Sequence, residues 1–242
     1  MSSAHENARR RDLLAVLFAL AFPTLMTVVY FVLLAGEASA IQQVAFSIGK
    51  AVQFLFPAVW IVRIERRPIG WQRPNRVDLA WGTSLGMALL AGTLVMCHFG
   101  LKPAGVFSEA VVEAIRKKVE GMGVATVPRF VALGIFYSLF HSLLEEYYWR
   151  WFVFGHLRRL ISLRPAIVVS GVGFMAHHVC VLSVFFGWFS IWSIGLSLAV
   201  AVGGMIWAWL YQRTGSLYGP WISHAFVDAA LFFVGYELLW QP

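Results

Sequence analysis

The chain has 242 residues, of which 60% are hydrophobic and 13% are charged, and its mean hydropathy is +0.72. This composition excludes a soluble globular protein and indicates an integral, multi-pass membrane protein whose surroundings are the lipid bilayer. The formal net charge of +7 does not indicate nucleic-acid binding, because the basic residues lie in short clusters between apolar segments, where membrane topology explains them.

Seven apolar segments are long enough to cross the roughly 30 Å hydrocarbon core of a bilayer. In chain order they are residues 13–35, 41–64, 78–100, 127–156, 165–186, 189–211 and 217–239. Between the third and the fourth, residues 108–120 place apolar side chains on one helical face and charges on the other, which predicts a helix at the membrane surface. The predicted fold class is all-α: a polytopic membrane helix bundle over residues 1–242, with about seven transmembrane helices plus one interfacial helix, in a single domain.

Basic residues predict the orientation of these spans. If the N-terminus is cytoplasmic, the clusters at residues 9–11, 63–76, 158–164 and 213 all face the cytoplasm, and only the basic residues of the 101–129 connection lie outside. The positive-inside rule favours this arrangement, so a cytoplasmic N-terminus is expected.

The fourth span contains two carboxylates and a guanidinium, Glu145, Glu146 and Arg150. By insertion scales each such group at the bilayer centre costs about 2.5–3.5 kcal/mol, so the cluster requires an explanation. Glu146 and Arg150 have i,i+4 spacing and can form an ion pair, whereas Glu145 points about 100° away from that pair. A structural ion pair does not need the second glutamate, and Glu145 is therefore the candidate reactive residue.

Three further intramembrane polar residues reach the depth of Glu145. At about 1.5 Å per residue, Glu145, His178 and Asp228 each lie roughly 20–22 Å from the nearest cytoplasmic arginine, and His224 lies one turn shallower than Asp228. A glutamate and histidines at one depth can activate a water molecule or hold a metal ion. Each histidine alone would fit a packing role, and only the set favours catalysis.

The order of these residues resembles a known family. The motifs Glu145-Glu146-x-x-x-Arg150, Phe174-x-x-x-His178 and His224-x-x-x-Asp228 lie on three late spans, as in the CPBP family of intramembrane proteases, also called the Abi family, which includes the type II CAAX prenyl endopeptidases. The resemblance covers residues 127–240 as a CPBP-like catalytic core. Its third motif most often ends in Asn, and Asp228 departs from that form.

The resemblance implies a function and a role for each residue. It implies an endopeptidase that hydrolyses a peptide bond in a membrane-associated peptide or protein substrate, a CAAX-like protein being one option. Glu145 would activate water with His178, His224 and Asp228 would bind the oxyanion or a metal, and Glu146 with Arg150 would hold the helix geometry. Glu145, His178 and His224 would be the ligands of a divalent metal, zinc or another; without a metal, Glu and His can activate water directly.

Two alternatives belong to other functional classes. An ion- or proton-coupled transporter would need polar groups staggered along a path, and their common depth argues against it. A non-catalytic membrane scaffold or bacteriocin immunity protein would not need the complete set of residues.

Two further patterns lie within the apolar spans. His177 and His178 diverge by about 100° on a helix, and the family spacing from Phe174 selects His178 as the catalytic histidine. Residues 82–86 fit G-x-S-x-G, but they lie within a predicted span, where small residues indicate close helix packing rather than a nucleophile.

Overall fold

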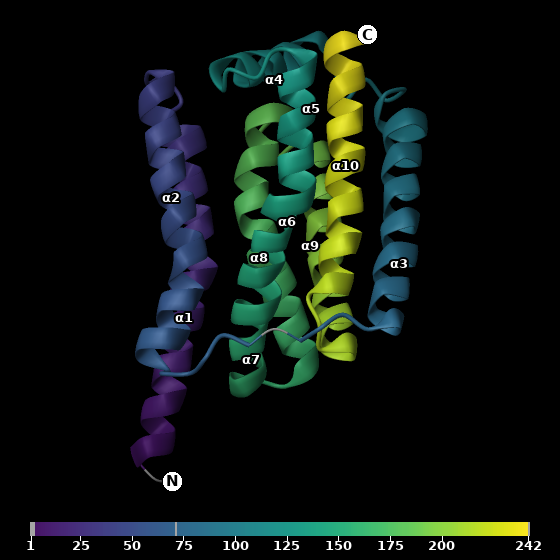
Figure 1. The fold of residues 1–242 in the computed structure, drawn as a ribbon. Helices are drawn as coiled ribbons and strands as arrows, with labels where there is room; N and C mark the ends of the chain where they lie inside the picture. The colour runs from purple at the N-terminus through teal and green to yellow at the C-terminus, as the bar shows by residue number, and fades with distance from the viewer. Residues whose placement is uncertain (1–2, 71, 242) are drawn as a thin grey trace. The chain divides into compact units, whose positions relative to one another are not determined.

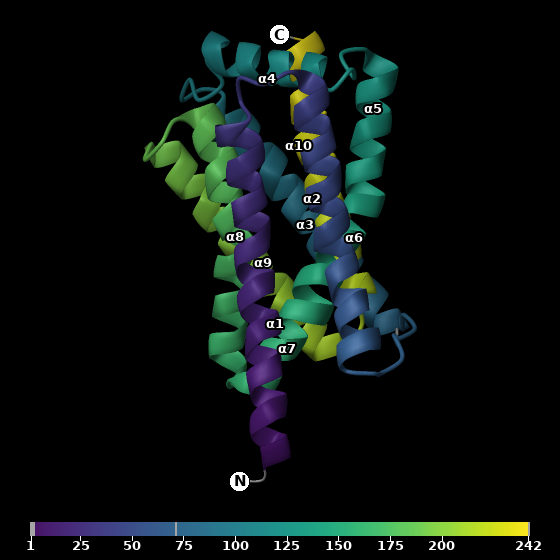
Figure 2. The same cartoon turned by 90° about the vertical axis from the view of Figure 1, so that its left-hand side faces the viewer.

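The computed structural model describes residues 3–70 and 72–241, and the described chain contains helices and loops but no strand. Among these described residues, seven helical segments are long and apolar enough to span a membrane, which confirms the predicted polytopic helical bundle and an integral, multi-pass membrane protein. These segments are His5–Leu33, Ser39–Ile64, Arg76–Leu101, Val127–Leu160, Leu163–Phe186, Ile191–Thr214 and Tyr218–Trp240. Figures 1 and 2 show their course along the chain.

The helices form two compact units. The first unit comprises Met1–Gln72 and Glu146–Arg213, and the second comprises Arg73–Glu145 and Thr214–Pro242. The chain passes from one unit to the other inside the fourth span, between the two adjacent glutamates.

The first unit is built around the N-terminal helix. It contains α1 (Ser3–Val28), η1 (Val29–Leu33), α2 (Ser39–Val59), η2 (Trp60–Ile64), η5 (Tyr147–Phe154), α7 (Gly155–Leu160), α8 (Leu163–Phe186) and α9 (Ile191–Thr214), where η marks π-helical turns. Helix α1 packs against α2, α7 and α8. Pro23, inside α1, has no N–H for the carbonyl of Ala19, and the Tyr148 hydroxyl donates to that carbonyl instead at 2.8 Å. The proline therefore provides an attachment point for the fourth span.

Small residues bring α8 and α9 together within the first unit. A β-carbon added to Gly204 would lie 3.2 Å from the Cα atom of Gly171, so the two backbones approach closely. Helix pairs in membranes commonly pack through such small residues, because dispersion contacts replace the hydrophobic effect there.

The second unit is organised around the C-terminal helix. It contains α3 (Arg76–Val95), η3 (Met96–Leu101), α4 (Glu109–Gly121), α5 (Val127–Phe136), η4 (Tyr137–His141), most of α6 (Ser142–Glu146) and α10 (Tyr218–Trp240). Helix α10 packs on α3, α5 and η4. β-Carbons added to Gly82 and Gly86 would lie 2.7 Å from the Cα atom of Gly219 and 3.1 Å from that of Ser223. The prediction that residues 82–86 serve helix packing is thus confirmed.

The predicted surface helix is α4, one residue further along than residues 108–120. Ser108 caps it by accepting a hydrogen bond from the backbone N–H of Val111. Its apolar face contributes Val119 to a buried cluster with Phe130 of α5 and Leu239 of α10. Figure 1 shows α4 lying across the ends of α5 and α10. The apolar stripe therefore covers the ends of its own unit.

Candidate active site

The two adjacent glutamates lie in a short α-helical turn between two π-helical segments. This turn is α6, and η4 and η5 precede and follow it directly. In π-helical turns the backbone hydrogen bonds run over one extra residue, which rotates the side chains relative to a regular α-helix. Such irregular turns occur frequently at functional sites.

Glu145 lies between two imidazoles of the second unit. Its side chain is buried, with Oε1 3.8 Å from His141 Nε2 and Oε2 3.8 Å from His224 Nε2. His141 belongs to the same span and His224 to α10, so the packing of α10 on η4 forms this group. Both separations are longer than a direct hydrogen bond. A water molecule can bridge the carboxylate and either ring at this distance.

Asp228 extends the group along α10. It follows His224 at i,i+4, and its Oδ1 lies 3.7 Å from His224 Nε2. The same ring nitrogen thus faces two carboxylates, those of Glu145 and Asp228. Glu145 and Asp228 can therefore both orient this ring.

Glu146 and Arg150 form the ion pair that their spacing predicted, in the first unit. Both side chains are fully buried, and Arg150 Nε lies 3.1 Å from Glu146 Oε2. Arg150 Nη2 also donates to the carbonyl of Gly204 at 3.2 Å. The guanidinium lies over the rings of Phe174 and Trp207, at 4.8 and 5.2 Å from their centroids. These contacts fix the fourth span against α8 and α9.

The two adjacent histidines of α8 have different surroundings within the first unit. His178 Nδ1 lies 2.9 Å from the carbonyl oxygen of Phe174, and because a carbonyl can only accept, Nδ1 is the donor in this contact. His177 instead stacks on Trp149, with ring centroids 5.8 Å apart and planes 7° apart. Glu145 belongs to the other unit, and its approach to His178 stays a prediction.

Two of the three predicted metal ligands, Glu145 and His224, lie close together. Tetrahedral zinc, with bonds of about 2.0–2.2 Å, holds its ligand atoms about 3.3 Å apart. Glu145 Oε2 and His224 Nε2 are 3.8 Å apart, so a small approach of the two side chains would bring them to that spacing. Carboxylate and imidazole are both ordinary zinc ligands.

A group with metal-ligand spacing lies elsewhere, in the first unit, and was missed from the sequence. Ligand atoms of Asp12, Glu65 and His156 all lie within 4.8 Å of one another. Arg159 Nη1, however, lies 3.4 Å from Asp12 Oδ1 and 3.1 Å from Glu65 Oε1, and Arg67 also pairs with Glu65. Because cations already neutralise these carboxylates, the group is an ion-pair cluster that joins α1 and α7 to the end of η2.

Glu65 is the centre of that cluster. Burial raises the pKa of its carboxyl, but hydrogen bonds from His156, at 2.6 Å, and from Arg159 outweigh burial and leave the pKa below its ordinary value. His156 Nδ1 also lies 2.7 Å from the carbonyl of Phe152. Its two ring nitrogens thus face a carbonyl and a carboxylate, which fixes the orientation of the ring.

The fold and the site together define a class: a polytopic helical membrane protein with a buried carboxylate between imidazoles. Residues 127–230 match a family model described as Type II CAAX prenyl endopeptidase Rce1-like. The match over these residues confirms the resemblance seen in the sequence. The match covers less than half of the chain and includes all six predicted site residues, Glu145, Glu146, Arg150, His178, His224 and Asp228. No curated protein and no solved structure matches the chain.

Proposed function

We propose that the chain is an intramembrane endopeptidase that hydrolyses a peptide bond of a membrane-associated substrate with a water molecule activated by glutamate and histidine. The observation that carries this proposal is the position of Glu145, buried between His141 and His224 inside the segment that matches the family of CAAX proteases. Membrane proteins seldom retain a buried carboxylate at this cost unless it has a function.

Glu145 is the general base. It takes a proton from the water while the water oxygen bonds to the scissile carbonyl carbon, and the carbonyl oxygen becomes an oxyanion. When the carbon–nitrogen bond breaks, the protonated Glu145 returns that proton to the leaving amine. The products are a carboxylic acid and an amine, and the enzyme regains its starting state. Two imidazoles near the carboxylate help to orient the water before it reacts.

His224 stabilises the oxyanion, and Asp228 supports His224. Asp228 Oδ1 and Glu145 Oε2 both lie near the same ring nitrogen and orient it, and an N–H of this ring would donate to the developing negative charge. His178, whose Nδ1 donates to the carbonyl of Phe174, would accept a hydrogen bond from the water at Nε2. A divalent metal, zinc or another, would be held by Glu145, His178 and His224, and when bound it would lower the pKa of its water.

Glu146 and Arg150 position the base rather than react. Their ion pair holds the turn that follows Glu145, and the contacts of Arg150 with Gly204 and Phe174 hold that turn against α8 and α9. A fixed backbone at residue 146 limits the freedom of the neighbouring glutamate, as precise catalytic geometry requires.

The substrate we propose is a membrane-anchored protein or peptide cut near its C-terminus, with a CAAX-like sequence as the first candidate. The proposed topology, with a cytoplasmic N-terminus, follows from the positive-inside rule. The test is cleavage of a library of membrane peptides by the purified protein in liposomes, with and without chelator. Defined cleavage products, whether formed with or without chelator, support the proposal. A peptide library that stays intact after incubation with folded protein contradicts it. Loss of cleavage with chelator alone, restored by zinc, would assign the metal.

A further inference from the structure

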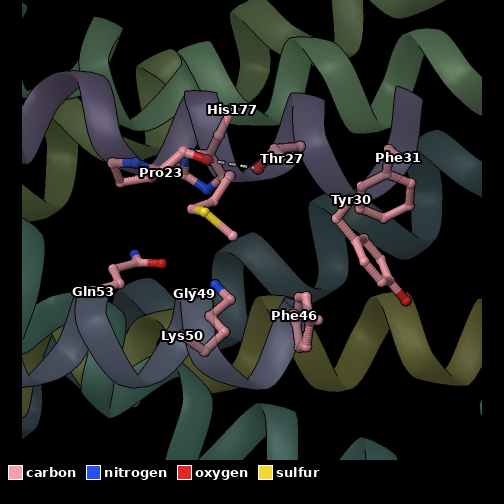
Figure 3. A pocket seen from close by; sticks show the side chains of 10 residues that line it. Pro23, Thr27, Tyr30, Phe31, Phe46, Gly49, Lys50, Gln53 and His177 are labelled. Carbon is pink, nitrogen blue, oxygen red and sulfur yellow. Dashed lines mark hydrogen bonds between the residues drawn. The ribbon is translucent and has the colours of Figure 1, made fainter. Parts of the chain in front are cut away.

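A cavity of the first unit contains polar groups that the proposed chemistry does not use. It lies between α1, α2 and α8 and has a volume of about 30 Å3, enough for about two water-sized groups. Lys50 and Gln53 line it from α2, and His177 lines it from α8. Figure 3 shows the ammonium of Lys50 and the amide of Gln53 on the face of α2 that looks toward His177.

Lys50 places a positive charge in the middle of a membrane span. It follows the start of the span, Ser39, by about 17 Å and precedes the end, Ile64, by about 21 Å, at 1.5 Å per residue. An extended lysine side chain cannot cover either distance to reach the membrane surface. Its Nζ lies 5.7 Å from the ring centroid of Phe46 and 5.2 Å from that of Phe54. Cations in such positions generally mark a site for an anion or for another charged group.

Gln53 supplies an independent observation. Its side chain is 3% exposed, and within the described chain its Nε2 makes no hydrogen bond. A buried amide donor without an acceptor costs about 1–3 kcal/mol, because it has lost its hydration without replacement. The cost would be removed by a ligand oxygen in the cavity that Gln53 lines.

The composition of the cavity restricts the ligand. Lys50 and the Gln53 amide nitrogen offer donors only, and Lys50 carries a positive charge, so the ligand is an anion with acceptor oxygens. Space for about two water-sized groups suits the two oxygens of a carboxylate better than the larger phosphate group. The cavity that Lys50 and Gln53 line also has apolar walls, formed by Met26, Tyr30 and Phe46. The ring centroids of Tyr30 and Phe46 are 4.9 Å apart. The chain attached to the carboxylate is therefore apolar.

We infer that this cavity binds the carboxylate at the end of an apolar chain, with Lys50 and Gln53 as its ligands. Two sources share this chemistry: a free fatty acid from the bilayer, and the C-terminal carboxylate of a hydrophobic peptide. The second source rests on the proposed function, and it draws support from the ring of His177, whose centroid is 4.1 Å from that of the predicted catalytic His178.

Equilibrium binding to the full-length Glu145→Gln variant in phosphatidylcholine nanodiscs tests the inference without any cleavage step. One arm uses radiolabelled dodecanoate with dodecanol as its neutral control. The other uses an apolar peptide with a free C-terminal carboxylate, with the same peptide amidated as its control. We expect saturable binding in at least one arm and weak binding of both neutral controls; the arm with the tighter binding identifies the source.

Variants of the cavity complete the test. Lys50→Met should weaken binding of the carboxylate at least about tenfold, because a charge-assisted hydrogen bond is lost, whereas Lys50→Arg should retain most of it. Gln53→Leu should also weaken binding of the carboxylate, although it removes no charge. This variant replaces Lys50→Met in the test if Lys50→Met does not fold. Equal binding of acids and neutral controls, no saturable binding, or unchanged affinity in folded Lys50→Met or Gln53→Leu would overturn the inference. Because Glu145→Gln cannot cleave in the proposed mechanism, a failure here leaves that mechanism standing.

Discussion

Replacing Glu146 by alanine should destabilise the first unit by leaving Arg150 without its carboxylate in a fully buried site. Removing one partner of a buried ion pair typically costs about 3–5 kcal/mol. Arg150 keeps its hydrogen bond to Gly204 and its contacts with two aromatic rings, so the loss should be near the lower limit, about 3 kcal/mol. For a chain of this size that corresponds to a fall in Tm of roughly 6–12 °C.

The two buried, free cysteines provide the assay. Cys180 lies on α8 in the first unit, and Cys97 lies on η3 in the second. In a Cys97→Ser background, heating the purified protein with a thiol-reactive fluorophore follows exposure of Cys180 and therefore unfolding of the first unit. The double variant Glu146→Ala/Arg150→Met is the matched control: it removes the stranded charge and should melt above Glu146→Ala. A Glu146→Ala variant that melts within 2 °C of the parent would refute the reasoning, as would a double variant that melts lower still.

Three further predictions concern packing, pH and topology. Gly82→Ala should destabilise the second unit by about 1–3 kcal/mol, followed by labelling of Cys97 on heating, because its β-carbon would meet the backbone of Gly219. Gly92→Ala on the same helix has open space and should be neutral or stabilising, so equal effects of the two variants would contradict the packing. The lowered pKa of Glu65 gives stability that is present above its ordinary value of 4.5 and is lost as the pH falls through the folded-state pKa. Thermal unfolding followed by circular dichroism between pH 7 and pH 3 should therefore show a smaller fall in melting temperature for Glu65→Gln than for the parent protein. An identical pH profile of the two proteins would argue against this contribution of Glu65. A cysteine at Lys117, in a background without the native cysteines, should react with impermeant reagent only from the outside, and cytoplasmic labelling would reverse the topology.

Local periodicity accounts for what the sequence predicted correctly. The seven spans follow from apolar length alone, and the Glu146–Arg150 pair follows from i,i+4 spacing. His224 and Asp228 share a face for the same reason. The glycines of α3 were correctly assigned to packing because their segment was apolar throughout. Each of these predictions depends on residues close together in the chain.

Contacts between distant segments could not be predicted in this way. Glu65 and His156 are 91 residues apart, and neither has a motif that would join them. Lys50 is a cation within an apolar span of the sequence, but its cavity is formed only by the packing of α1, α2 and α8. The π-helical turns on both sides of the glutamates also lack a local sequence signature. They change side-chain directions that a regular helix would fix.

The most direct test of the account is the activity of Glu145→Gln on a cleaved membrane peptide, measured beside the parent protein at equal yield and equal melting temperature. Glutamine keeps the shape of the side chain and cannot take a proton from water, so the account predicts a loss of cleavage of several orders of magnitude in a protein that inserts and folds normally. Full cleavage by a folded Glu145→Gln variant would contradict the assignment of Glu145 as the base.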